Sequence, residues 1–91
     1  PGAPRQIFSA ATIGKSIYVF GGVTQKTSEK FYNLDDAFRF DTKTNKWRGI
    51  KKMPIAMRAF WAGSDGKSVY LIGGYSESGL DTVYRYSPTK D

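Results

Sequence analysis

A phrase of nine residues occurs twice in this chain. Residues 14–22 read GKSIYVFGG, and residues 66–74 read GKSVYLIGG, 52 positions later. Self-similarity at a period near ~50 residues is typical of a repeat architecture, in which one unit cannot bury its apolar face alone. We therefore expect this chain to act as a section of a longer array or as a self-associating piece.

The residues around the two copies predict short strands separated by turns. In the first unit, apolar, β-branched and aromatic residues favour strands at 6–13, 16–20, 37–40 and 46–48. The second unit repeats three of them, at 58–62, 69–72 and 82–86, and the sequence ends before a counterpart of Trp47. No segment shows the apolar spacing of a helix. We predict an all-β chain of antiparallel strands, with a four-stranded unit at 1–53 and a three-stranded unit at 54–91 that lacks its fourth strand.

Composition excludes several classes of function. A chain of 91 residues can form one domain at most, and this chain contains neither histidine nor cysteine. The commonest metal ligands and the commonest general base are therefore missing, and we expect no metal site and no cofactor. The net charge of +6 is scattered along the chain, whereas a nucleic-acid binder usually gathers its charge in one stripe. No apolar run reaches the ~18 residues of a membrane span.

The repeated Gly-Lys-Ser is also the end of the phosphate-binding loop motif, but the residues before it do not fit that motif. That motif needs a glycine five residues before its Gly-Lys pair, and Ser9 and Trp61 stand there. We interpret both copies as hairpin turns.

The order of the elements resembles the kelch repeat. Tyr18-Val19-Phe20-Gly21-Gly22 is followed by a variable loop, Phe40-Asp41, Thr44-Asn45, Trp47 and Met53-Pro54. The resemblance covers about one and three-quarter repeats, and it implies four-stranded blades of a β-propeller, which has typically ~4–8 blades. It also implies that the repeated aromatic side chains pack between blades, namely Tyr18, Tyr70, Phe40, Tyr86 and Trp47.

Alternating connections would place the hairpin turns at 14–15, 41–45 and 65–67 on one rim and the longer loops on the other. The longest loop is predicted at 23–35, and loops on rigid scaffolds commonly carry function. Our candidate ligand-binding residues on this rim are Arg5, Arg58, Tyr32, Tyr75 and Glu77. The two arginines could hold a carboxylate or brace neighbouring loops, the tyrosines could stack on sugars or simply pack, and Glu77 would need desolvation to act as an acid or base.

Two functions remain open from the sequence. The chain can be a scaffold segment that recognises a ligand or a protein through its loop-rich rim. Alternatively, the sequence resembles bacterial sialic-acid epimerase/mutarotase-type kelch proteins. No complete set of catalytic residues of that family can be matched here, so we expect the segment alone to be inactive. The expected partners are the remaining blades or other copies of the chain, with a protein or carbohydrate ligand. The resemblance implies a periplasmic or secreted protein in the mutarotase case and a cytoplasmic one otherwise.

Overall fold

The computed structural model describes residues 4–25, 30–76 and 83–88, and within these ranges the chain forms strands and no α-helix. No helix that could cross a membrane occurs among them either. The strands are β1 (Ser9–Ile13), β2 (Ser16–Phe20), β3 (Val23–Gln25), β4 (Phe31–Asn33), β5 (Ala37–Asp41), β6 (Lys46–Ile50), β7 (Arg58–Ser64), β8 (Val69–Tyr75) and β9 (Val83–Tyr86).

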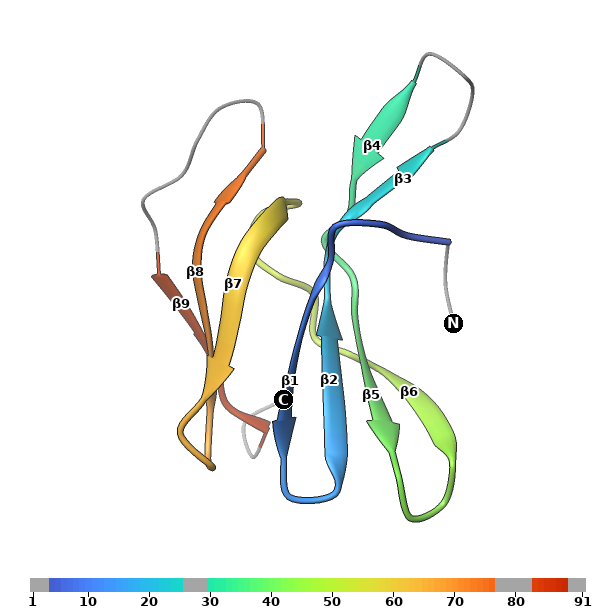
Figure 1. The fold of residues 1–91 in the computed structure, drawn as a ribbon, viewed down its shortest axis with the longest axis vertical. Coiled ribbons are helices and arrows are strands. Elements are labelled where there is room, and N and C mark those ends of the chain that lie inside the picture. The colour runs from blue at the N-terminus through green and yellow to red at the C-terminus, as the bar shows by residue number, and fades with distance from the viewer. Residues whose placement is uncertain (1–3, 26–29, 77–82, 89–91) are drawn as a thin grey trace.

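The strands form two main antiparallel sheets that stand side by side (Figure 1). The first sheet has the order β1-β2-β5-β6, and the second has the order β7-β8-β9. β1 and β7 are in contact, so the two sheets meet most closely along their first strands. The prediction of an all-β chain of antiparallel strands is therefore confirmed, although the strand predicted at 6–13 begins only at Ser9.

The segment predicted as the longest loop differs from that expectation. β3 and β4 pair as a short hairpin that projects beyond the first sheet (Figure 1). Val23 and Thr24 are only 5% and 6% exposed, so the first two residues of β3 are buried against the rest of the chain. The second unit differs too, because β8 continues through Gly73 and Gly74 to Tyr75, whereas the double glycine was expected to end the strand.

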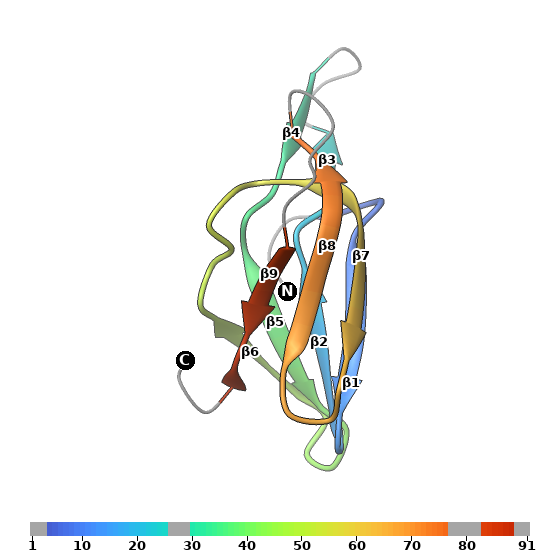
Figure 2. The same ribbon diagram turned by 90° about the vertical axis from the view of Figure 1, so that its left-hand side faces the viewer.

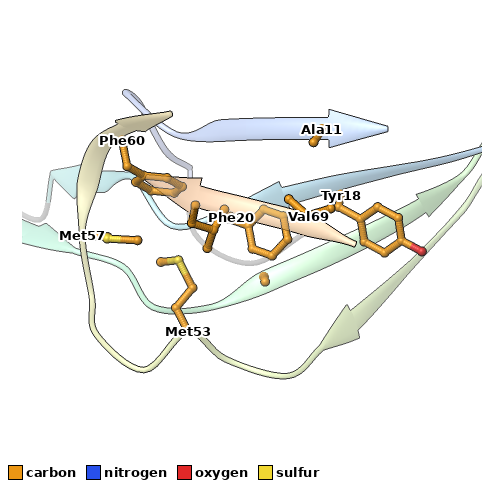
Figure 3. Close-up of a cluster of buried hydrophobic side chains, with 9 residues drawn as sticks. Ala11, Tyr18, Phe20, Met53, Met57, Phe60 and Val69 are labelled. Atoms are coloured by element: carbon orange, nitrogen blue, oxygen red, sulfur yellow. The ribbon is translucent and has the colours of Figure 1, made fainter. Parts of the chain in front are cut away.

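The hydrophobic core lies between the two sheets, and in Figure 2 the second sheet lies in front of the first. The first sheet contributes Tyr18 and Phe20, and the second contributes Val69 and Leu71, all less than 5% exposed. Met53 and Met57 enter from the connection between the sheets and close one end of the core (Figure 3). One sheet therefore supplies the cover that the other needs, as expected for repeats that cannot bury a face alone.

The aromatic layer predicted between the blades is confirmed between the two sheets for two of its members, and for the others it stays a prediction. Tyr18 and Tyr86 do meet there, with ring centroids 5.7 Å apart. Phe40 instead pairs with Trp47, at a centroid distance of 4.9 Å, on the opposite side of the first sheet. The reason is strand alternation, because Phe40 stands opposite Ile17 in the register while Tyr18 stands opposite Arg39. Tyr70 likewise lies on the side of the second sheet that faces away from the first.

The first strand of each sheet has a residue in the left-handed backbone region near its start. This residue lies just before β1 in the first sheet and within β7 in the second. Ile7 has φ of 54° and Ala59 has φ of 56°, and the two positions are 52 residues apart, like the repeated phrase. A left-handed conformation is uncommon for residues other than glycine and is costly for a β-branched one. The same backbone conformation therefore recurs at two matching positions, although one carries isoleucine and the other alanine.

The hairpin turns at the other rim are stabilised by aspartates. Asp41 accepts hydrogen bonds from the backbone N–H groups of Lys43 and Thr44, at 2.9 and 3.3 Å. Asp65 accepts them from Lys67 and Ser68, at 2.9 and 2.8 Å. Because hydrogen bonds to a carboxylate favour its charged form, the pKa of Asp41 is lowered chiefly by the Lys43 N–H, and that of Asp65 chiefly by the Ser68 N–H.

These lowered pKa values predict an acid-sensitive stability. The stabilisation is complete above the ordinary aspartate pKa of 3.8 and is lost as the pH falls below it and through the lower folded-state pKa. Replacing both residues by asparagine keeps an oxygen acceptor and removes the titration. We expect the Asp41→Asn/Asp65→Asn protein to lose less stability than wild type on acidification, measured by urea denaturation at a series of pH values. Parallel pH curves for the two proteins would contradict this.

Candidate functional site

The loop-rich rim lies where β2 and β8 end, at the opposite end of the sheets from the aspartate turns (Figure 1). Its described parts are residues 4–8, the β3–β4 hairpin with residues 34–36, the connection at 51–57, and residues 73–76. The turns at 14–15, 42–45 and 65–68 lie together at the other end. The sequence thus predicted the division between the two rims correctly.

Arg5 is held inside the first repeat. Its side chain is 8% exposed and forms a two-pronged ion pair with Asp36, with Nη1–Oδ1 at 2.9 Å and Nη2–Oδ2 at 3.1 Å. Nη1 also donates to the carbonyl oxygen of Gly21 at 2.9 Å, and the guanidinium lies 5.3 Å from the ring centroid of Phe38. This geometry matches the fork of an arginine to a carboxylate. Arg5 therefore braces the chain before β1 against the start of β5, and its binding of a ligand stays a prediction.

Arg58 links the two repeats. Its Nη1 donates to Oδ1 of Asn33 at 2.9 Å, and Nδ2 of Asn33 donates to the carbonyl oxygen of Ser76 at 3.0 Å. The base of the β3–β4 hairpin is therefore tied to the start of β7 and to the residue after β8. Sequence reasoning missed Asn33, because a lone asparagine in a variable loop carries no signal of the residues that surround it in space.

The three remaining candidates are placed differently. Tyr32 lies in β4 opposite Thr24 and is 47% exposed, and its neighbour Phe31 is 54% exposed. Tyr75 ends β8, where its backbone is paired with that of Arg58, while its side chain is outside the described part of the structure. Glu77 lies outside the described residues. The structure thus brings Arg58 to the end of β8 and presents Tyr32 on the hairpin.

Backbone hydrogen bonds hold the rim to the connection between the sheets. The N–H of Gly22 donates to the carbonyl oxygen of Met57 at 2.9 Å, and the N–H of Met57 donates to that of Leu34 at 3.2 Å. The N–H of Met53 donates to the carbonyl oxygen of Asp35 at 2.8 Å. The hairpin therefore projects from a base that is fixed at several points, which suits a surface that must present side chains in a defined arrangement.

No cluster of three metal-ligating side chains occurs in the part of the chain that the structure describes. The two aspartates whose pKa values are lowered, Asp41 and Asp65, lie at the opposite rim. A cleft of about 300 Å³ opens beside the connection and β9, and its lining includes Lys51, Lys52 and Arg85.

The comparisons with known proteins agree with the strand pattern and the two-sheet arrangement. The kelch motif matches residues 4–54 and 62–91. This chain belongs to the kelch family. It is 33% identical over 89 residues to Kelch-like protein 25 of Rattus norvegicus, which covers 97% of this chain and 14% of the relative. It is also 34% identical over 84 residues to N-acetylneuraminate epimerase of Vibrio vulnificus, covering 88% of this chain and 22% of the relative.

The kelch chain therefore spans less than a quarter of each of these relatives. A second N-acetylneuraminate epimerase, from Yersinia pestis, is 34% identical over 88 residues, with 92% of this chain and 22% of the relative covered. The two kinds of relative confirm the kelch repeat itself. The division of the chain at residue 53 stays a prediction.

Proposed function

We propose that this kelch segment is a recognition scaffold whose loop-rich rim binds a protein partner. The observation that carries the proposal is the β3–β4 hairpin, which exposes Phe31 and Tyr32 from a base that is hydrogen-bonded to the rest of the rim. Exposed aromatic side chains on a rigid support are the kind of anchors that dominate protein interfaces. Further kelch units would flank the segment and complete the structure around it.

Site-specific photo-crosslinking tests this proposal. A photoreactive phenylalanine analogue is placed at Tyr32 and, as a matched control, at Thr44, an exposed residue of the opposite rim. We expect a defined protein adduct from position 32 and none from position 44. The adduct should be suppressed by excess unlabelled wild-type chain and persist with excess Phe31→Ser/Tyr32→Ser chain. Equal adducts from both positions, or equal suppression by both competitors, would refute rim recognition.

A second candidate function is part of a carbohydrate epimerase or mutarotase that acts on a sialic acid. It is favoured by the relatives named N-acetylneuraminate epimerase, together with the position of Arg58 on the rim, where a guanidinium could meet the carboxylate of such a sugar. Arg5 is the weaker contributor, because its side chain is only 8% exposed. The anomerisation rate of N-acetylneuraminate, measured by NMR with the full-length protein that carries this segment, decides between the two functions. Acceleration that Arg58→Ala removes and Arg48→Ala retains would support the enzyme.

A further inference from the structure

Strand β6 forms the free edge of the first sheet. In the order β1-β2-β5-β6 it is the strand farthest from β1, which contacts the second sheet (Figure 1). It pairs with β5 along its whole length, from Lys46 to Ile50, and no described strand pairs with its other side. Residues 46–49 are all exposed. An edge of this kind presents backbone N–H and C=O groups to which a further strand can hydrogen-bond.

The chain around this edge is strongly basic. The ten residues 43–52 contain five cations and no carboxylate, and the cations are Lys43, Lys46, Arg48, Lys51 and Lys52. They belong to the turn before β6, to the strand itself and to the two residues that follow it. Arg39 of β5 adds to them, because it stands directly opposite Arg48 in the register. Like charges in directly opposite positions repel each other.

The two opposed arginines differ in the groups that balance their charge. Nε of Arg39 donates to Oγ of Ser16 at 2.8 Å, and its Nη2 lies 4.0 Å from Oδ2 of Asp41. The ion pairs between described residues include none for Arg48, which is exposed at the edge of the sheet. A carboxylate placed beyond Arg48 would therefore meet a guanidinium that no described carboxylate pairs, and it would relieve the repulsion from Arg39.

A strand added beside β6 would set its own residues opposite those of β6, one for one. Because side chains alternate along a strand, Lys46 and Arg48 lie on one face of β6 and Trp47 lies on the other. Carboxylates at alternate positions of the added strand would therefore stand opposite both cations, where opposite charges attract. Cations on an edge also discourage pairing with a second copy of the same edge. The strand that fits this edge thus carries the opposite charge.

We propose that β6 is a docking edge for an extended acidic peptide segment of a partner protein. The segment adds to the first sheet as a further strand, with its carboxylates opposite Lys46 and Arg48. A peptide is favoured over a nucleic acid because the edge offers main-chain hydrogen bonds as well as positive charge. Phe31 and Tyr32 of the loop-rich rim belong to a different sheet, so the proposal goes beyond rim recognition and does not rest on it.

Fluorescence anisotropy tests the proposal with the full-length protein that carries this segment. The probe is a short labelled peptide that alternates glutamate with valine. We expect Arg48→Glu to weaken its binding by about tenfold or more. Lys67→Glu, the same charge change at an exposed turn of the second sheet, should leave binding unchanged, and so should Phe31→Ser/Tyr32→Ser. Arg48→Gln should give a smaller loss, and it replaces Arg48→Glu should that variant lose the circular dichroism of wild type.

Two further peptides separate strand addition from simple attraction of charge. The first has the same composition with its glutamates in one block, and the second has methylated backbone nitrogens, so that it keeps its charge but cannot donate main-chain hydrogen bonds. Both should bind wild type more weakly than the alternating peptide does. The proposal is overturned if either peptide binds as tightly, if Arg48→Glu and Lys67→Glu have equal effects, or if wild type binds no peptide. Tighter binding of a labelled oligo-uridine would overturn it in favour of a nucleic acid.

Discussion

Gly21→Ala should destabilise the folded chain by about 3 kcal/mol or more, because it combines backbone strain with overpacking. Gly21 has φ of +57°, and a Cβ there would lie 2.5 Å from Cε of Met53 and 2.7 Å from the carbonyl oxygen of Met57. The methionine end can move, but the carbonyl belongs to the hydrogen-bonded connection between the sheets. Urea denaturation followed by tryptophan fluorescence measures the loss, and absence of a cooperative transition would be its extreme form.

Gly14→Ala is the matched control for this change. Gly14 has nearly the same φ, +58°, and open space where a Cβ would stand. Its cost is the left-handed strain alone, about 1 kcal/mol after allowance for the stiffer unfolded chain. If the two alanine variants lose equal stability, the close approach of the rim to the double glycine is not what selects glycine at position 21.

Phe20→Ala should cost about 3–5 kcal/mol, the range for removing a large buried aromatic side chain. Phe20 is 1% exposed in the core between the sheets, and its ring lies 5.7 Å from that of Tyr86, centroid to centroid. Removal opens a cavity that is walled by both sheets, so relaxation of one sheet cannot fill it.

Ile72→Ala, at the matching position of the second sheet, should cost less than about 1 kcal/mol because the side chain is 43% exposed. The comparison is made by urea denaturation followed by tryptophan fluorescence. Similar losses for Phe20→Ala and Ile72→Ala would mean that the side chain of Ile72 is packed as tightly as that of Phe20.

The strands and their grouping could be predicted because the necessary information is local. Alternation of apolar and polar residues, the Gly-Lys turns and the aspartate turns each act over a few neighbouring residues. The hairpin at 23–33 was missed because its arms are only three residues long and are separated by polar residues. Likewise, the sequence could not show that Tyr18 and Phe40 point to opposite sides of the sheet until the register between β2 and β5 was known.

The candidate site was harder to predict than the fold. The repeated arginines drew attention, and the rim they occupy is correct, but the two side chains have different environments. Arg5 finds Asp36 within its own repeat, whereas Arg58 reaches Asn33 of the other repeat. Those partners lie 31 and 25 residues away along the chain, so only the tertiary structure distinguishes a bracing arginine from one that bridges two repeats.

The hydrogen bonds between the connection and the hairpin base have a consequence for folding. In a repeat array, stability divides into the intrinsic stability of each unit and the coupling between neighbours. Here the coupling is not confined to apolar contact between sheets, because Met57 forms backbone hydrogen bonds with Leu34 and Gly22 of the preceding unit. Opening the first unit at its rim would release the segment that leads into the second. We therefore expect the two repeats to unfold as one cooperative element, with the double glycine, where Gly22 donates to Met57, as one of the points that join them.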